Sequence, residues 1–129
     1  MTPAGPASEI DREFLLAFWK VHVLHHAGEG SVVGQWMMRE LRQHGYEVSP
    51  GTLYPLLARM EGRGWVRSKV DPNGGRRARK EYTLTRQGRS VLALLRRHVA
   101  ELHREVVLGE GEAPGASAGR STRRRRTGS

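Results

Sequence analysis

Apolar positions recur with two different periods along this chain, and the change of period separates its elements. In residues 9–28, 31–45 and 49–64 the apolar residues return every three or four positions, which is typical of amphipathic helices. In residues 65–70 and 79–84 they alternate with polar residues, and the intervening segment 71–75 is rich in turn-forming residues. The pattern therefore predicts three helices followed by a β-hairpin.

The ends of the first two helices are predicted from capping residues. Ser8, with Asp11 three positions later, predicts the start of the first helix, and Gly28 and Gly30 predict its end. The second helix is expected to begin near Ser31 and to end at Gly45. The residues expected to face the core are Ile10, Phe14, Leu15, Phe18, Trp19, Val21 and His25 in the first helix, and Val33, Trp36, Met37 and Leu41 in the second.

The third helix has the clearest pattern. Ser49 is a good N-cap residue, and Pro50 suits the first helical position, where a missing N–H costs nothing. Pro55 is expected to be tolerated with a slight kink near the N-terminal end. The apolar face has the i, i+3, i+4, i+7 spacing of a helix that packs on a core: Leu53, Leu56, Leu57 and Met60.

A fourth, longer helix is predicted from Thr85, as its cap, to about Leu108. One apolar strip has heptad spacing, and we predict that it forms a dimer interface: Leu92, Leu95, Val99, Leu102 and Val106. A second strip contains Val91 and Leu94. The two strips together have more hydrophobic surface than one small domain can cover. One strip is therefore expected to pack on the first helix and the other on a partner; the alternative is that both belong to the core.

The predicted fold is mainly α with a small β-hairpin, a winged helix-turn-helix plus a long C-terminal dimerisation helix. Residues 1–8 are interpreted as a flexible N-terminus, 9–85 as the DNA-binding domain, 86–108 as the dimerisation helix, and 109–129 as a disordered basic tail. No apolar stretch approaches the roughly 20 residues of a membrane span. The N-terminus has no signal-peptide pattern, and we expect a cytoplasmic protein.

Charge points to a polyanionic partner. The chain carries 22 Lys and Arg against 13 Asp and Glu, a net charge of +9. The last twenty residues contain five Arg and two Glu, so +3 belongs to them and +6 to the rest of the chain. Neutralising phosphates releases condensed counterions, so double-stranded DNA is the expected partner. The run Arg123–Arg126 would add non-specific affinity, or be a neutral tail.

The elements place candidate DNA contacts in two segments. In a helix-turn-helix the second helix presents its N-terminal residues to the major groove, and here that helix is the third of the chain. The hairpin carries six basic residues against two acidic ones, and the alternative is that they are simply a solvated face. The predicted DNA-binding residues are Ser49, Gly51, Thr52, Tyr54, Arg59, Lys69, Gly74, Arg76, Arg77, Arg79 and Lys80.

Two segments in order closely resemble the PadR-type transcriptional regulators. They are GTLYPLLARMEGRGWV at residues 51–66 and RKEYTLTRQG at residues 79–88, and the similarity extends over about residues 10–108. The resemblance implies a winged helix domain with a C-terminal dimerisation helix, in the compact branch of the family. It also implies a repressor of an inverted repeat, with Tyr54 contacting phosphate and with Gly51 and Thr52 at the DNA-facing end.

Other candidate sites are weaker. Trp19 and Trp36 are candidates for an effector pocket, with core packing the favoured interpretation. His22, His25 and His26 have the spacing of a helical zinc or copper site. The chain has no cysteine, however, and Glu29 is the one acidic residue nearby that could act as a further ligand. We therefore predict no metal and no cofactor. A partly buried cluster against the last helix, which could make the dimer pH-sensitive, is the favoured interpretation. No nucleophile with a base and no paired carboxylates are found, so an enzyme is not expected.

Three functional hypotheses follow. The first is a sequence-specific, homodimeric regulator, expected to be a repressor that a small-molecule effector could release. The second is an architectural or accessory DNA-binding protein that reads few bases. The third is a protein-interaction or ligand-sensing module whose winged helix no longer binds DNA. Alanine substitution of the hairpin arginines Arg76, Arg77 and Arg79 distinguishes the third hypothesis from the first two. If the protein binds DNA, the substitutions should abolish that binding without loss of folding.

Overall fold

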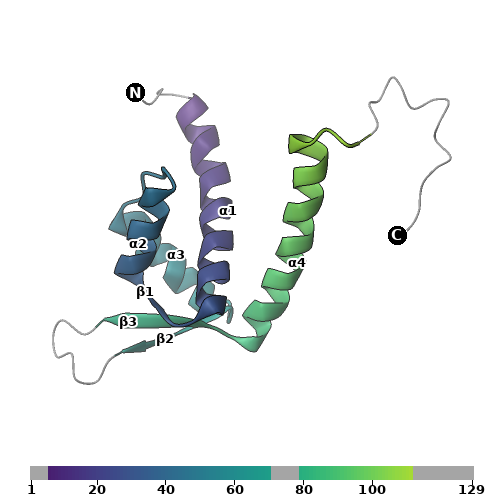
Figure 1. Ribbon diagram of the computed structural model, residues 1–129. Coiled ribbons are helices and arrows are strands. Elements are labelled where there is room, and N and C mark those ends of the chain that lie inside the picture. Colours follow the sequence, from purple (N-terminus) through teal and green to yellow (C-terminus); the bar gives the residue numbers. More distant parts are fainter. Residues whose placement is uncertain (1–5, 71–78, 112–129) are drawn as a thin grey trace, which may run out of the picture. The chain divides into compact units, whose positions relative to one another are not determined.

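The computed structural model describes residues 6–70 and 79–111 of the chain (Figure 1). The backbone divides into two compact units, residues 1–95 and residues 96–129. The elements, in order, are α1 (Pro6–Glu29), β1 (Val32–Val33), α2 (Gly34–Gln43), α3 (Pro50–Gly62), β2 (Val66–Val70), β3 (Lys80–Leu84), α4 (Arg86–Leu102) and the π-helical turn η2 (His103–Val107). The described residues include no helix that is both long and apolar enough to cross a membrane.

Helix α1 differs from the prediction at its start and in part of its buried face. It begins at Pro6, so Ser8 lies inside it and is not the cap, and it ends at Glu29, directly before Gly30, as predicted. Phe14 and Phe18, predicted to face the core, are 58% and 46% exposed. The apolar pattern of this helix is broad enough to fit several rotations. The fold buries Trp19, as predicted, but together with Val23, Leu24 and Ala27, which were not predicted.

Helices α2 and α3 form the predicted helix-turn-helix. The turn between them includes Gly45, whose φ of +94° is readily adopted only by glycine. The Arg42 guanidinium donates two hydrogen bonds, of 3.2 and 3.1 Å, to the carbonyl oxygen of Val48 and so closes the turn. Pro50 follows an extended Ser49, as predicted, but the Ser49 hydroxyl makes no capping bond to the helix backbone.

The hairpin is confirmed, and the structure adds a strand that the sequence analysis missed. Strands β2 and β3 are antiparallel, with Val66 opposite Leu84. The two-residue strand β1 pairs with the other edge of β3, giving the order β1-β3-β2. Val33 had been assigned to a helix starting near Ser31; that helix starts at Gly34. Two residues are too few to produce a recognisable alternation, which explains the error.

The core lies where α1, α2 and α3 cover the small sheet (Figure 1). Its largest fully buried side chains come from all three helices and from β2: Val23, Leu24, Met37, Leu41, Leu53, Leu56, Leu57, Met60 and Val66. The predicted inward face of α3 is therefore confirmed at all four positions. Burial of these nine side chains contributes on the order of 1.5–3 kcal/mol each before the entropy of ordering them is subtracted.

The start of α4 packs very closely on the strand β2 region. Thr85 caps the helix as predicted, because its Oγ1 accepts a 2.9 Å hydrogen bond from the backbone N–H of Gly88. The Thr85 backbone N–H donates to the carbonyl oxygen of Trp65. The hydroxyl proton is shared between that oxygen, at 3.0 Å, and the carbonyl oxygen of Gly64, at 2.5 Å. A Cβ on Gly88 would lie 2.0 Å from the Trp65 oxygen. Glycine at position 88 therefore permits the contact between α4 and Trp65.

Candidate nucleic-acid interface

Helix α3 has a buried face and a polar face, as a recognition helix requires. Its leucines and Met60 are at most 1% exposed, which fixes the rotation of the helix about its axis. The opposite face therefore presents Gly51, Tyr54 and Arg59, all exposed, with Thr52 half-buried beside them. The Ser49 hydroxyl donates a 3.3 Å hydrogen bond to Thr52 Oγ1, so the two predicted polar residues lie together at the N-terminal end. Free backbone N–H groups at such an end attract phosphate.

Tyr54 is positioned by a glycine of α2. A Cβ built on Gly34 would lie only 2.6 Å from the Tyr54 ring, so the ring rests directly on the first residue of α2. Tyr54 keeps 37% of its surface exposed, which leaves one side of the ring accessible. The sequence analysis identified Tyr54 but gave no role to Gly34. The spacing of the two residues in the sequence carries no signal of this contact, which exists only in the folded domain.

The hairpin presents basic side chains on its outward face. Val66, Tyr82 and Leu84 are buried, so the alternate positions of β2, with Arg67 and Lys69, face away from the core. Lys69, Arg79 and Lys80 are all exposed, as a DNA contact would require. Gly74, Arg76 and Arg77, which were predicted as contacts at the tip, lie outside the described residues.

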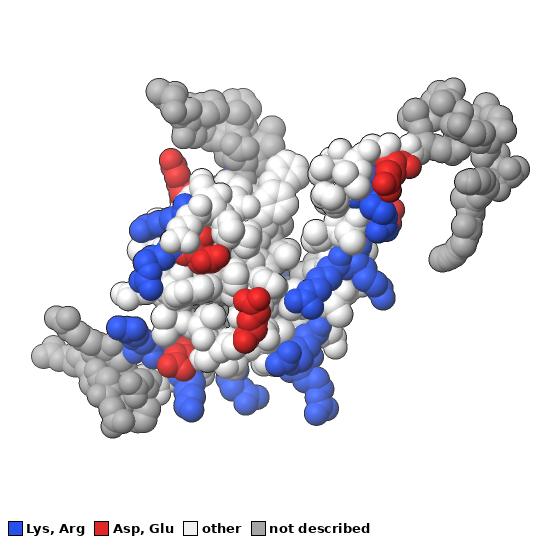
Figure 2. Space-filling model, viewed as in Figure 1, with Lys and Arg blue, Asp and Glu red and all other residues white. Residues whose placement is uncertain are grey.

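Lys and Arg gather along the edge formed by the sheet and the first turns of α4 (Figure 2). This edge extends the predicted surface, because Arg86 and Arg89 at the start of α4 are exposed and were not predicted. The first turn of α4 contains no acidic residue. Positive charge at a helix N-terminus is unfavourable for the helix dipole, and this local conflict is a sequence signal that could have identified the two arginines as functional.

A carboxylate connects α3 to the hairpin. Glu61 accepts hydrogen bonds from both the backbone N–H and the hydroxyl of Ser68, at 3.0 and 2.8 Å. These bonds lower the pKa of Glu61, so it is an anion at neutral pH. Burial, with smaller contributions from nearby Glu61 and Tyr54, raises the pKa of the Tyr82 phenol, which therefore stays neutral. The contact between Glu61 and Ser68 fixes β2 relative to the candidate recognition helix.

The predicted partner strip on the last helix divides into two parts. Leu92 is 4% exposed and Leu95 is packed against the same core, so these two positions face their own domain and not a partner. The later positions, Val99, Leu102 and Val106, are 49%, 57% and 69% exposed. Val106 lies in η2, whose wider turns shift a side chain out of the heptad phase of an α-helix. Val107 at the end of η2 and Leu108 directly after it are also exposed.

The two candidate pocket tryptophans have different positions. Trp36 lines an open pocket of about 420 Å³ together with His26, Glu29, Ser31, Val32 and Glu81. Trp19 is 4% exposed and belongs to the core. Its indole N–H has no hydrogen-bond acceptor among the described residues. Trp36 is therefore retained as a candidate for an effector pocket, and Trp19 is not.

The histidines of α1 lie against α2 and the segment that follows it. The sequence analysis had predicted that they lie against the last helix. The His22 ring lies 5.2 Å from the ring of His44 and 5.7 Å from that of Tyr46, measured between centroids. Burial, followed by the neighbouring histidines, lowers the pKa of His22. The rings of His26 and Trp36 meet in an edge-to-face arrangement, with centroids 5.2 Å apart.

Comparison with known proteins gives one consistent result. Residues 23–94 match the family described as "Transcriptional regulator PadR-like family". The "Transcriptional regulator Rv3488" of Mycobacterium tuberculosis is 46% identical over 104 residues, which are 81% of this chain and 96% of that protein. A PadR family transcriptional regulator from Eggerthella lenta is 30% identical, with a TM-score of 0.62 over 81% of this chain and 96% of its own. The protein smu.1704 from Streptococcus mutans, at 21% identity, shares the fold with a TM-score of 0.67 over 76% of this chain and 93% of its own.

Proposed function

The chain belongs to the PadR-like family of transcriptional regulators, and from this premise we propose that it is a homodimeric repressor that binds an inverted-repeat operator. The observation that carries the proposal is the arrangement of α3 beside the hairpin. The N-terminal residues of α3 are free of the core, and the outward face of β2 adds positive charge next to them. Base reading by α3 and phosphate contacts by the hairpin would then act on the same stretch of duplex.

The proposed contacts divide by chemistry. Gly51, Thr52 and Tyr54 supply the end of α3 that enters the major groove, where small and polar groups approach base edges and flanking phosphates. Arg59, Lys69, Arg79 and Lys80 supply charge to the phosphates, and the exposed Arg86 and Arg89 extend this set. Residues 9–85 then form the DNA-binding domain that the sequence analysis proposed.

Dimerisation is supported by exposed apolar side chains that a monomer leaves in water. Large hydrophobic residues are exposed on α1, α4 and η2 of the described chain: Phe14, Phe18, Leu94, Val99, Leu102, Val106, Val107 and Leu108. Apolar patches of this kind mark protein–protein interfaces in soluble proteins. Two domains on one duplex also multiply an affinity that a single small domain seldom reaches.

Selection of bound DNA from a random pool tests the proposed function. We expect purified protein to enrich an inverted repeat whose half-sites lie about one helical turn apart, since each α3 must meet the same face of the duplex. The affinity for the selected site should exceed that for scrambled DNA of equal length by about 10³-fold or more. Equal affinity for both DNAs would favour an architectural protein, and no binding to either would favour a module that has lost this function.

The proposed dimer contact is tested by a charged variant of α4. We expect Val99→Asp combined with Leu102→Asp to weaken self-association by more than about tenfold, because each buries an unpaired charge in the interface. Both positions are exposed in the single chain, so folding should persist. Sedimentation velocity measures the change. The control Gln43→Asp adds a charge at an exposed position of α2, and equal behaviour of variant and control would place the dimer contact elsewhere.

A further inference from the structure

Four of the six histidines of the chain meet two glutamates at the end of α1 and on α2. The group, called here the histidine cluster, consists of His22, His25, His26, Glu29, Glu40 and His44. Only the first four residues are close together in the sequence. The fold brings in Glu40 and His44 from α2 and the residue after it, which the sequence analysis did not consider when it predicted no metal.

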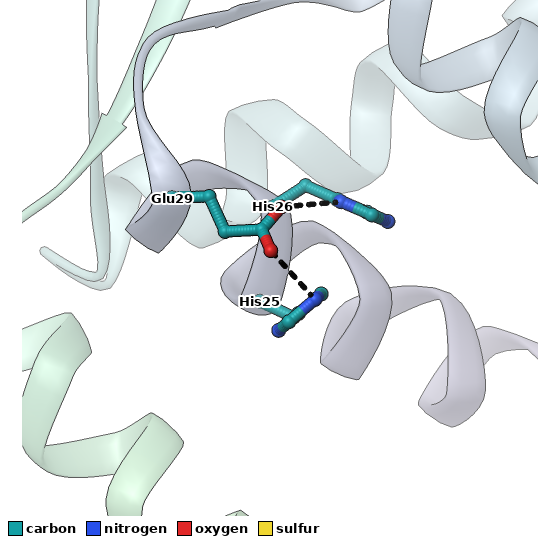
Figure 3. Close-up of side chains that lie close together, drawn as sticks. All are labelled: His25, His26 and Glu29. Atoms are coloured by element: carbon teal, nitrogen blue, oxygen red, sulfur yellow. Dashed lines mark hydrogen bonds and ion pairs between the residues drawn. The ribbon is translucent and has the colours of Figure 1, made fainter.

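Three members of the cluster direct ligand atoms toward one another. The carboxylate of Glu29 turns one oxygen to His25 Nε2 and the other to His26 Nδ1, each at 3.3 Å (Figure 3). One ligand atom from each residue lies within 4.8 Å of the others. Around a tetrahedral Zn²⁺ with bonds of about 2.0–2.1 Å, ligand atoms lie about 3.3–3.4 Å apart. Each histidine has this spacing to one oxygen of Glu29, but to a different oxygen in each case, so the exposed Glu29 carboxylate would rotate or bind through both oxygens to complete the set.

His26 also has the surroundings of a metal-bound histidine. Its Nε2 lies 3.8 Å from an oxygen of Glu40, which in turn is 3.1 Å from Nε2 of His44. When Nδ1 binds a metal, Nε2 carries the proton, and a carboxylate that accepts a hydrogen bond from it fixes the ring and increases its basicity. At 3.8 Å, Glu40 lies beyond hydrogen-bond distance and would move closer to take this role. The ring is only 12% exposed and is held against Trp36. Its orientation is therefore set before any ion arrives.

We propose that His25, His26 and Glu29 bind a divalent transition-metal ion of the Zn²⁺ type, with Glu40 orienting His26. Two imidazole nitrogens and one carboxylate suit Zn²⁺, Co²⁺ or Ni²⁺, whereas Mg²⁺ and Ca²⁺ prefer oxygen ligands. Three protein ligands leave a fourth position for water or a small anion. His26 and Glu29 both line the open pocket beside Trp36, so this position has access to solvent.

The site is tested on the full chain, purified without a polyhistidine tag, stripped of metal and kept free of DNA. Titration calorimetry with Zn²⁺ should give one ion per chain, and Mg²⁺ should give no binding. Co²⁺ should bind competitively and report its coordination through visible absorption. We expect His25→Ala and Glu29→Gln each to weaken Zn²⁺ binding by about a hundredfold or more. The two side chains are 44% and 61% exposed, and neither belongs to the core, so both variants should fold.

Glu40→Gln separates a metal site from a mere group of ion pairs. Loss of an orienting carboxylate should weaken Zn²⁺ binding by about 10–100-fold while the stoichiometry stays at one. The double variant His98→Asn and His103→Asn removes the two histidines outside the cluster and should leave binding unchanged. Undiminished Zn²⁺ affinity in His25→Ala, or equal loss in the double control, would overturn the assignment. Because DNA is absent, these results do not depend on the proposed repressor function.

Discussion

Alanine at position 88 is expected to destabilise the folded chain by about 3 kcal/mol or more, the largest single effect that we expect from one methyl group. Added volume in a packed core costs about 1–3 kcal/mol when side chains can yield. Here the new Cβ would lie 2.0 Å from the carbonyl oxygen of Trp65 and 2.6 Å from Leu84 Cδ1. The carbonyl cannot move cheaply, because it accepts a hydrogen bond from the backbone N–H of Thr85 and shares the proton of the Thr85 hydroxyl with the Gly64 carbonyl.

Thermal unfolding of Gly88→Ala measures this effect. For a domain of this size each kcal/mol lowers Tm by about 4–8 °C, so a decrease of more than about 12 °C is expected. Gly62→Ala is the matched control, since it adds the same methyl group in α3 where no atom lies within 4 Å. That change should stabilise the protein slightly, because alanine favours the helix. Similar Tm values for the two variants would show that α4 does not approach Trp65 so closely.

Removing three basic side chains from the hairpin is expected to lower operator affinity by about a hundredfold or more. The variant replaces Lys69, Arg79 and Lys80 with alanine, and in a dimer it removes up to six phosphate contacts. Each contact contributes about 0.9 to the slope of log K against log salt, so the slope should become less steep by about 5. All three side chains are exposed, and exposed substitutions of this kind change stability by about 0.5 kcal/mol or less each.

A variant with the same loss of charge controls for long-range electrostatics. It replaces Arg12, Lys20 and Arg97, which lie on α1 and α4 outside the proposed surface. Fluorescence anisotropy with the selected operator, measured at several salt concentrations, should show a nearly unchanged slope for this control. If both variants lose the same affinity and slope, net charge and not the hairpin determines binding. If neither loses affinity, the hairpin does not contact phosphate.

Elements with a long local pattern could be predicted from the sequence. The four inward residues of α3 and the pairing of β2 with β3 need only periodicity and turn residues, and both are confirmed. The burial of Leu92 and the exposure of Phe14 could not be predicted. Periodicity shows that a helix has an apolar face, but when two faces are apolar it does not show which one meets the core.

Contacts between distant segments were also beyond the sequence analysis. Gly34 supports the ring of Tyr54 twenty positions later, and Glu40 reaches His26 from another helix. Neither pair leaves a periodic or compositional trace, because each depends on how the helices cross. The candidate DNA contacts, in contrast, could be predicted from the sequence, because the residues of α3 and of the hairpin lie in two continuous segments with recognisable patterns. The site residues proposed here therefore combine local patterns with tertiary support that only the fold reveals.

The short strand β1 has a consequence for the order in which the chain folds. Val66 pairs with Leu84 across 18 positions, whereas Val32 pairs with Tyr82 across 50. Closing the longer loop costs more chain entropy, and such distant contacts slow folding. During synthesis, moreover, β1 has no partner until residue 82 has left the ribosome. We therefore expect β1 to pair later than the hairpin forms, and a chain cut short before β3 would expose its unpaired strand to other chains.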